Sequence, residues 1–380
     1  MGKSVICGLI LAALSGAFFC SCTNKNVAEN DVSAIDTLTT NARLLTMVER
    51  ADGVVLATIK NPWQQGQALG TYAFVPCDSA VPEDLPAGVR VLRTPVERMA
   101  VFSAVHASAL GELGAQKNIV ATVDVDFLPA DNAMRQGVES GEVLNAGNSQ
   151  SPSLEILAQS QAQAVLRSPI KDNTLAKLPA SMVPVECVDY METTPLARAE
   201  WILLLGELAG ERDSARTIYN NVVERYNKIV SRVAESKEAA PKVLVETEYS
   251  GVWYVPAGES YMARMIADAG GDYPWKDTEG SGSLNLNLES VAHKAIDADV
   301  WLVRSYGYET TPASLTAMNS RYSVFKALQQ GNIYSCNSAE RNIFDDVAFH
   351  PELVLADYAA IFHPDVFEGY KLRYFIRSSK

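Results

Sequence analysis

The chain has 380 residues, of which 48% are hydrophobic and 20% are charged. This composition is typical of a soluble globular protein with room for two domains. Its formal net charge of −13 argues against a nucleic-acid partner, because no excess of Lys and Arg is present to neutralise phosphates. An acidic balance otherwise indicates solubility and no particular function.

The N-terminus carries an apolar stretch, Val5–Phe19, behind the positively charged Lys3. At roughly 15 residues the stretch is too short for a transmembrane helix, and it predicts a secretory signal peptide over residues 1–21. The stretch leads into FCSC, in which the small Ser21 precedes Cys22. This ending resembles a bacterial lipobox and predicts that Cys22 is lipidated. The alternative is an ordinary signal peptide whose cysteines are incidental.

Residues 22–49 are expected to form a lipidated polar tether. Their segment TNKNVAENDVSAIDT has no aromatic residue and no clear periodicity, so it should not bury enough surface to order itself. Three cysteines follow the tether, Cys77, Cys187 and Cys336. Their odd number and wide spacing give neither a disulfide framework nor a paired zinc motif. We expect buried, small hydrophobic side chains, and a single disulfide among the three stays open.

Residues 50–194 are predicted to form an N-terminal α/β lobe. Two alternating segments, VVLATIKNP and QALGTYAFVP, predict strands of an early hairpin or meander. A strand over 99–102, a helix over about 104–113 and a strand over 119–123 follow, with Gly114 ending the helix. This order favours parallel strands joined by a right-handed crossover.

Residues 195–240 are predicted to be a helical linker, because no strand pattern occurs there. One helix should cover 196–208, with an interruption near Gly210, and a second should cover about 211–236. Apolar residues of the second helix recur every three or four positions and cover one face. They are Ala215, Ile218, Val222, Tyr226, Ile229 and Val233.

Residues 241–380 repeat the earlier pattern and predict a C-terminal α/β lobe. The segment NSQSPSLEILAQSQAQAVLRS of the first lobe has its counterpart in NLNLESVAHKAIDADVWLVRS of the second. Both pass through a Leu-Glu pair into a short helical pattern and a β-rich segment that ends in Arg-Ser. The sequence therefore predicts an α/β protein with two similar lobes joined by a single long, rigid helix.

This arrangement resembles the substrate-binding proteins of ABC importers for iron–siderophore complexes, haem and cobalamin. The resemblance covers about residues 50–375 and rests on the segment VERMAVFSAVHASALGELGAQKNIVATVD, the two Leu-Glu segments, the long helix and HPELVLADYAAIFHPDVF near the end. It implies a ligand cleft between the lobes and a permease dimer as partner. It also implies a monomeric lipoprotein in the bacterial cell envelope, most naturally facing the periplasm.

Within this resemblance, one acidic residue of each lobe docks onto arginines of the transporter. Glu155 and Glu289 occupy the matching positions, and two carboxylates on the outer face can contact a two-fold symmetric permease as a pair. The alternative is that each glutamate stabilises its helix dipole, worth about 0.3–1 kcal/mol.

Ligands of open α/β sheets bind at the carboxyl ends of strands, and this rule selects candidate ligand-binding residues in both lobes. They are Phe102, Ser103, His106, Asp126, Phe127 and Arg167 in the first lobe, and Trp253, Tyr254, Arg304, Tyr306, Arg341 and Phe344 in the second. His106 is either a hydrogen-bonded helix cap or a metal ligand of a bound chelate. A bare-metal site is disfavoured, because the four histidines form no cluster with cysteines.

The ligand class follows from the arginines. Converging Arg167, Arg304 and Arg341 would repel one another without a counter-charge, and an anionic ligand would offset that cost. This favours a ferric siderophore, while the aromatic residues suit cobalamin or haem equally well. No resident cofactor is expected besides such a bound metal chelate.

An enzyme is the competing class of function. SPIK and SVFK match Ser-x-x-Lys, yet the companion motifs of a penicillin-type site are absent, as are a Gly-x-Ser-x-Gly elbow and His-Glu-x-x-His. We therefore expect a binding protein. A lipoprotein that scavenges ligand without a permease is a third interpretation. The sequence leaves open which chelate binds and whether the anchor lies in the inner or the outer membrane.

Overall fold

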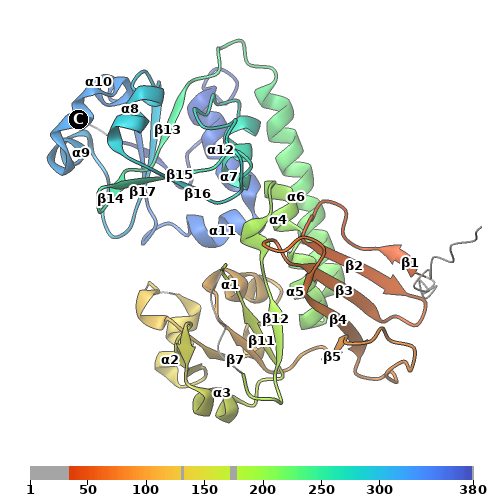
Figure 1. Cartoon of the computed structure of the whole chain (residues 1–380). Coiled ribbons are helices and arrows are strands. Elements are labelled where there is room, and N and C mark those ends of the chain that lie inside the picture. Colours follow the sequence, from red (N-terminus) through yellow and green to blue (C-terminus); the bar gives the residue numbers. More distant parts are fainter. Residues whose placement is uncertain (1–33, 130–131, 172–177, 379–380) are drawn as a thin grey trace, which may run out of the picture. The chain divides into compact units, whose positions relative to one another are not determined.

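The computed structural model describes residues 34–129, 132–171 and 178–378. In these residues an α/β lobe is followed by three helices and a second α/β lobe (Figure 1). The predicted fold class, α/β with two similar lobes, is confirmed. The signal peptide and Cys22 lie outside the described residues, and no described helix is long and apolar enough to cross a membrane.

The first lobe opens with a five-stranded sheet in the order β1-β2-β3-β4-β5. Strands β1 to β4 form an antiparallel meander, and β5 pairs with β4 in parallel. The predicted pairing of the two alternating segments, now β3 and β4, is confirmed. The strands are β1 (Ala34–Thr37), β2 (Leu45–Arg50), β3 (Val55–Lys60), β4 (Ala68–Pro76) and β5 (Arg90–Thr94).

The predicted tether over residues 22–49 is too long, because β1 and all but the last residue of β2 fall within it. Two carboxylates from the region of the linker helices hold the connection between these strands. Glu200 accepts hydrogen bonds from the backbone N–H groups of residues 40, 41 and 42. Glu192 accepts hydrogen bonds from the backbone N–H groups of residues 43 and 44. Burial raises the pKa of Glu192, against the hydrogen bonds that it accepts from Trp201 and this backbone. These distant partners order a segment that has no apolar pattern of its own.

A parallel sheet in the order β12-β11-β6-β7-β8 forms the rest of the first lobe. Helix α1 packs on one face, in a core with Met99 and Leu166, and α3 packs on the other face, where Leu157 meets Val165. The strand–helix–strand prediction is confirmed by β6, α1 and β7. The elements are β6 (Met99–Val101), α1 (Ala104–Glu112), η1 (Gln116–Asn118), β7 (Ile119–Thr122), η2 (Val125–Phe127), α2 (Ala133–Ser140), β8 (Leu144–Asn145), β9 (Gly147–Asn148), β10 (Ser151–Pro152), α3 (Leu154–Ser160), β11 (Ala164–Arg167), β12 (Val183–Glu186) and η3 (Asp189–Met191).

The linker contains α4 (Pro195–Ala199), α5 (Ile202–Ala209) and α6 (Arg212–Val233). The first predicted helix is thus divided into two, and the second is four residues shorter than the expected 26. The 22 residues of α6 span about 33 Å. Tyr219 near its start belongs to the core of the first lobe, and Tyr226 belongs to the core of the second. The predicted apolar stripe therefore joins both cores.

The second lobe contains a sheet in the order β13-β17-β18-β19 and an antiparallel sheet in the order β14-β15-β16. Both contribute to one continuous core. The elements are β13 (Val243–Val245), β14 (Glu248–Tyr249), β15 (Val252–Pro256), α7 (Tyr261–Asp268), β16 (Ser283–Leu286), α8 (Leu288–Ala295), β17 (Val300–Ser305), α9 (Pro312–Met318), η4 (Ser320–Val324), α10 (Lys326–Gln330), β18 (Ile333–Asn337), α11 (Ile343–Phe349), α12 (Pro351–Phe362) and β19 (Ile376–Arg377).

A second connection between the lobes runs through α11. Ala348 and Phe349 of this helix are buried in the core of the first lobe. Directly after it, His350 lies between two carboxylates: Nε2 is 2.7 Å from Oε2 of Glu112 on α1, and Nδ1 is 3.4 Å from Oε1 of Glu352 on α12. The lobes therefore share apolar and polar contacts in addition to α6.

The cysteines at 77, 187 and 336 form no disulfide with one another. Cys187 and Cys336 are buried, as expected, and burial raises the pKa of Cys336 to about 12. Cys77 is exposed, so the expectation of burial is wrong for this residue. It lies just after β4, where the sheet meets solvent.

Candidate functional site

A cavity of about 880 Å³ lies at one end of the second lobe's sheets. Its volume falls in the range of small-molecule sites. The lining combines aromatic rings, hydroxyl groups and two arginines. The charged and aromatic residues that line it are Tyr190, Arg198, Glu246, Glu248, Tyr249, Tyr254, Tyr261, Arg304, Tyr306, Tyr308 and Phe344.

The carboxyl ends of neighbouring parallel strands position much of this lining. Glu246 follows β13, and Arg304 and Tyr306 lie at the end of β17, which pairs with β13 in parallel. From the other side, η3 and α4 contribute Tyr190 and Arg198. The rule that ligands bind at the carboxyl ends of strands therefore locates this cavity.

Arg304 is held in the cavity wall by Glu246. Its Nε donates a hydrogen bond of 2.6 Å to Oε1 of Glu246, and a second guanidinium nitrogen donates to the same oxygen. Its guanidinium carbon lies 5.3 Å from the ring centre of Phe344, in cation–π geometry. Burial works to lower the pKa of Arg304, but the charge of Glu246 outweighs it and raises that pKa.

The backbone of Glu246 is in the left-handed region, with φ of 62°. A non-glycine residue pays about 1–3 kcal/mol for such a conformation unless its surroundings impose it. Here the backbone N–H of Glu246 donates to the carbonyl of Leu302, and its carbonyl accepts from Nε1 of Trp301. Backbone strain of this kind is common at functional sites, which supports the assignment of this cavity as the candidate functional site.

A second chain of polar contacts runs from the cavity into the first lobe. Arg198 donates to the hydroxyl of Tyr261 at 2.7 Å, and its Nε donates to Oδ2 of Asp189 at 3.0 Å. The other oxygen of Asp189 lies 2.9 Å from Nε2 of His106. Burial works to raise the pKa of Asp189, but its two basic partners outweigh that effect and hold this pKa well below its ordinary value.

His106 is only 2% exposed, and its Nδ1 has no partner. It does not cap α1, so the interpretation as a helix cap is wrong, and it is not among the residues that line the cavity. The α1 cap position belongs to Ser103, whose side chain makes no capping bond. His106 instead supports Asp189, which fixes Arg198.

Four of the predicted ligand-binding residues line the cavity together: Tyr254, Arg304, Tyr306 and Phe344. The three aromatic side chains are between 43% and 59% exposed, which leaves them available to a ligand. Tyr306 also reaches the first lobe, where its hydroxyl donates a long hydrogen bond of 3.5 Å to the carbonyl of Phe127. Phe127 itself is 75% exposed.

The structure places other predicted residues away from the cavity. Trp253 is fully buried, stacks on Trp301 at 5.7 Å and donates to the carbonyl of Val245. Phe102 is partly buried and packs against the core beneath α3. Asp126 is exposed on η2. The prediction of Trp253 as a ligand contact is wrong, since neighbouring strand residues face opposite sides of a sheet.

The expectation of arginines without counter-charges is also wrong. Arg167 forms a two-pronged ion pair with Glu186, at 3.0 and 2.7 Å. Arg341 donates to Glu309 at 2.6 Å, and neither arginine is among the residues that line the cavity. The charge argument for an anionic ligand therefore loses its basis.

Several lining residues were not foreseen from the sequence, among them Arg198, Tyr261, Tyr190 and Tyr308. Arg198 lies on α4 in the helical linker and Tyr190 lies on η3 just before it, outside the strand ends that guided the prediction. Tyr308 lies two positions after Tyr306 in the loop that follows β17. This short spacing could have identified Tyr308 as a candidate together with Tyr306. Among the described residues, no three His, Cys, Asp or Glu side chains gather as metal ligands.

The two repeated glutamates occupy matching positions. Glu155 lies in the first turn of α3, which Ser153 caps, and Glu289 lies in the first turn of α8, which Asn287 caps. Both are exposed. Arg321 lies 2.6 Å from Glu289. The hydrogen bond to its own backbone N–H, followed by that from Arg321, lowers the pKa of Glu289.

Comparison with known proteins places this architecture. Residues 100–340 match the family described as periplasmic binding protein. An uncharacterized lipoprotein of Methanocaldococcus jannaschii is 26% identical over 316 residues, which cover 80% of this chain and 73% of that protein.

Three solved structures are similar in fold. A TroA-like periplasmic binding protein, FepB, from Veillonella parvula has a TM-score of 0.55 and 18% identity over 76% of this chain and 96% of that one. A periplasmic heme-binding protein from Pseudomonas aeruginosa has a TM-score of 0.57 and 12% identity over 75% and 99%. The vitamin B12 binding protein BtuF of Vibrio cholerae has a TM-score of 0.51 and 11% identity over 72% and 99%. With the family match extending over more than half of its residues, the chain belongs to the periplasmic binding protein family.

Proposed function

We propose that this protein is the extracytoplasmic substrate-binding component of an ABC importer and that it carries a metal chelate. The observation that carries the proposal is the cavity of about 880 Å³, whose walls combine exposed tyrosines with arginines held in ion pairs. Aromatic walls of this kind suit a large, partly flat ligand. The proposal assigns binding and delivery to the chain, and no catalysis.

Charge balance favours one class of chelate over the others. Glu246 neutralises Arg304, and Asp189 neutralises Arg198, while Glu248 adds a further carboxylate to the lining. A strongly anionic ferric siderophore would therefore meet no free positive charge from these arginines. A chelate of low net charge with an extended apolar and amide surface fits better. We therefore favour cobalamin over haem and over the ferric siderophore that the sequence favoured.

Proteins of similar fold support this range of ligands, but they do not favour one of them. The Pseudomonas aeruginosa protein is a heme-binding protein, BtuF is a vitamin B12 binding protein, and a Helicobacter pylori protein of similar fold was solved with Ni(II) bound. All three ligands are bulky chelates or metal species. Their sequence identity to this chain is 12% or less. At this level the similarity establishes the fold, and the ligand has to be measured.

Calorimetric titration of the purified protein with cyanocobalamin, haemin and ferric enterobactin tests the ligand class. We expect the tightest binding for cyanocobalamin and a loss of about tenfold or more in Tyr254→Ala. Ala158→Gly, at an exposed position of α3, serves as a control outside the cavity. Binding of ferric enterobactin alone would reverse the order of ligands, and binding of none of the three would contradict the chelate proposal.

The proposed anchor is a lipid on Cys22. We expect Cys22→Ala to abolish fatty-acid labelling and to release the protein from membranes, whereas Cys20→Ala should keep both. Unchanged labelling of Cys22→Ala would contradict lipidation at this residue.

The proposed docking residues are Glu155 and Glu289. Their equivalent, exposed places at the starts of α3 and α8 support a role as a pair. Changing both to Ala should leave chelate affinity intact and stop uptake by cells. Normal uptake would favour the helix-dipole role or a scavenger that needs no permease.

A further inference from the structure

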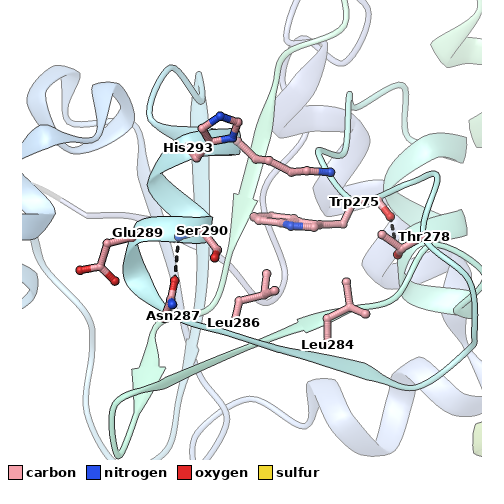
Figure 2. A pocket seen from close by; sticks show the side chains of 9 residues that line it. Trp275, Thr278, Leu284, Leu286, Asn287, Glu289, Ser290 and His293 are labelled. Atoms are coloured by element: carbon pink, nitrogen blue, oxygen red, sulfur yellow. Dashed lines mark hydrogen bonds between the residues drawn. The ribbon is translucent and has the colours of Figure 1, made fainter.

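A shallow groove of about 640 Å³ lies on the second lobe, between the end of β16 and α8 (Figure 2). Leu284 and Leu286 point from β16 toward the ring of Trp275, and these three residues form an apolar floor. Both leucines are half-buried, so part of each remains accessible. The cavity described above shares none of these residues.

The rim of the groove carries opposite charges at its two ends. Glu289 is directed outward at one end (Figure 2). Toward the other end of α8 lie His293 and Lys294, and Nζ of Lys294 is 3.4 Å from the carbonyl of Pro274. A partner segment is therefore complementary if it has a cationic group at one end, an apolar side chain in the middle and an acceptor at the other end.

The ion pair between Glu289 and Arg321 does not block such a partner. Both side chains are strongly exposed, 67% and 60%, and a pair of this kind contributes little to stability in water. An arginine from a partner could replace Arg321 at small cost, with two parallel hydrogen bonds to the carboxylate.

The first lobe differs at the equivalent place. Leu154, which precedes Glu155, is 47% exposed, whereas its counterpart Leu288 is 4% exposed. The first lobe thus presents an apolar protrusion beside its glutamate, and the second lobe presents an apolar groove beside its own. Two similar helices with the same acidic residue therefore offer different surfaces to a partner.

We propose that the groove over Trp275, Leu284 and Leu286 binds an extracytoplasmic loop of the permease, through an apolar side chain that neighbours the arginine bound by Glu289. This proposal rests on the proposed function and adds a second contact to it. The groove is continuous with Glu289 on α8, and its two ends can contact a cationic group and a hydrogen-bond acceptor of such a loop. Because Leu154 protrudes beside Glu155 whereas Leu288 is buried beside Glu289, the contact would distinguish the two halves of the docked protein.

Filling the groove tests the proposal. Ser290 lines the groove on α8 and is exposed, and its backbone N–H donates to the side chain of Asn287. Ser290→Trp should fill the space without disturbing the core, and Leu286→Ser should remove part of the floor. Ser214→Trp, at an exposed position in the first turn of α6, is the matched control.

Full-length variants replace the native protein in cells, and uptake of radiolabelled cyanocobalamin, haemin and ferric enterobactin is measured beside calorimetric affinity. We expect uptake to fall about tenfold or more in both groove variants at unchanged affinity, and to stay normal in Ser214→Trp. The melting temperature should stay unchanged in Ser290→Trp and fall modestly in Leu286→Ser, because Leu286 packs against the core of the second lobe. Normal uptake in both groove variants, with uptake lost in the Glu155 and Glu289 double variant, would overturn the groove and leave the proposed function intact.

Two other outcomes also decide the matter. If the wild-type protein binds none of the three chelates and supports no uptake, the proposed function fails and the groove proposal falls with it. If the wild-type protein is a dimer that Ser290→Trp dissociates, the groove binds a second copy of this chain, and the permease loop is excluded as its occupant.

Discussion

The two lobes contain the same arrangement of arginine and glutamate, but only one of them uses it in a cavity. In the first lobe, Arg167 at the end of β11 pairs with Glu186 at the end of the adjacent β12. In the second, Arg304 near the end of β17 pairs with Glu246 directly after the adjacent β13. Arg304 also contacts Phe344 and lines the cavity, whereas Arg167 does not.

This difference shows what the repeat preserves. Paired charges at the carboxyl edge of a parallel sheet join neighbouring strands in both lobes, so the pairing is part of the shared scaffold. The ligand surface is supplied mainly by the second lobe, through tyrosines in its loops and on β15. A repeated residue therefore indicates a repeated structural role, and ligand binding has to be established for each copy separately.

The largest effect is expected from the aromatic core of the second lobe. Trp253→Ala should lower the free energy of unfolding by about 4 kcal/mol, because it removes a fully buried ring from a cluster with Trp301 and Tyr322. Tyr254→Ala, one position along β15, should cost little stability and weaken ligand binding. Chemical denaturation and calorimetry measure the two quantities. Equal stability losses in the two variants would contradict the division of β15 into a core face and a cavity face.

The paired charges give the second comparison. Glu186→Gln and Glu246→Gln should each lower the free energy of unfolding by about 2–3 kcal/mol, since each removes a carboxylate that pairs with a largely buried arginine. Only Glu246→Gln should change ligand affinity, and it should strengthen ferric enterobactin binding by about tenfold, because it frees the charge of Arg304. An equal change of affinity in Glu186→Gln would show that the pair of Arg167 and Glu186 contributes to ligand binding as well.

Local patterns were enough to predict most of the fold. The expected helix over 104–113 is found at Ala104–Glu112, and the expected strand over 119–123 at Ile119–Thr122. The strands β1 and β2 were missed because their connection is ordered by Glu192 and Glu200, about 150 residues away in the chain. No window of sequence contains such a contact.

The site was predicted only in part, for a related reason. The rule about strand ends found Tyr254, Arg304, Tyr306 and Phe344, because it depends on topology. It gave no information on which face of β15 meets the core, so Trp253 was included wrongly. It also did not identify the carboxylates that form ion pairs with the arginines. Those ion pairs depend on the lateral order and register of strands that are distant in sequence.

His350, which connects the lobes, gives a smaller effect with a defined pH dependence. Burial works to lower its pKa, but hydrogen bonds to Glu112 and Glu352 raise that pKa from 6.5 to about 10. A pKa raised by folding stabilises the folded state fully below about pH 6.5, and this stabilisation is lost as the pH rises through about 10. His350→Gln should thus lower the free energy of unfolding by about 2 kcal/mol at pH 6 and by much less above pH 10. A difference that does not depend on pH would contradict a charged His350 between the lobes.

The smallest expected change is the movement of the lobes when ligand binds. Helix α6 carries Tyr219 in one core and Tyr226 in the other, and Phe349 of α11 is buried in the core of the first lobe. Hinge bending would have to withdraw Phe349 and separate His350 from Glu112, whereas flexible strands between lobes would have no such cost. We expect a rotation of roughly a few degrees, too small for a clear change in the radius of gyration. Small-angle scattering with and without cyanocobalamin measures it, and Phe349→Ala is the variant that should loosen the contact and enlarge the motion. A clear contraction of the wild-type protein would mean that the contact between α11 and the first lobe opens during binding, and both lobes would then have to contribute to the closed ligand site.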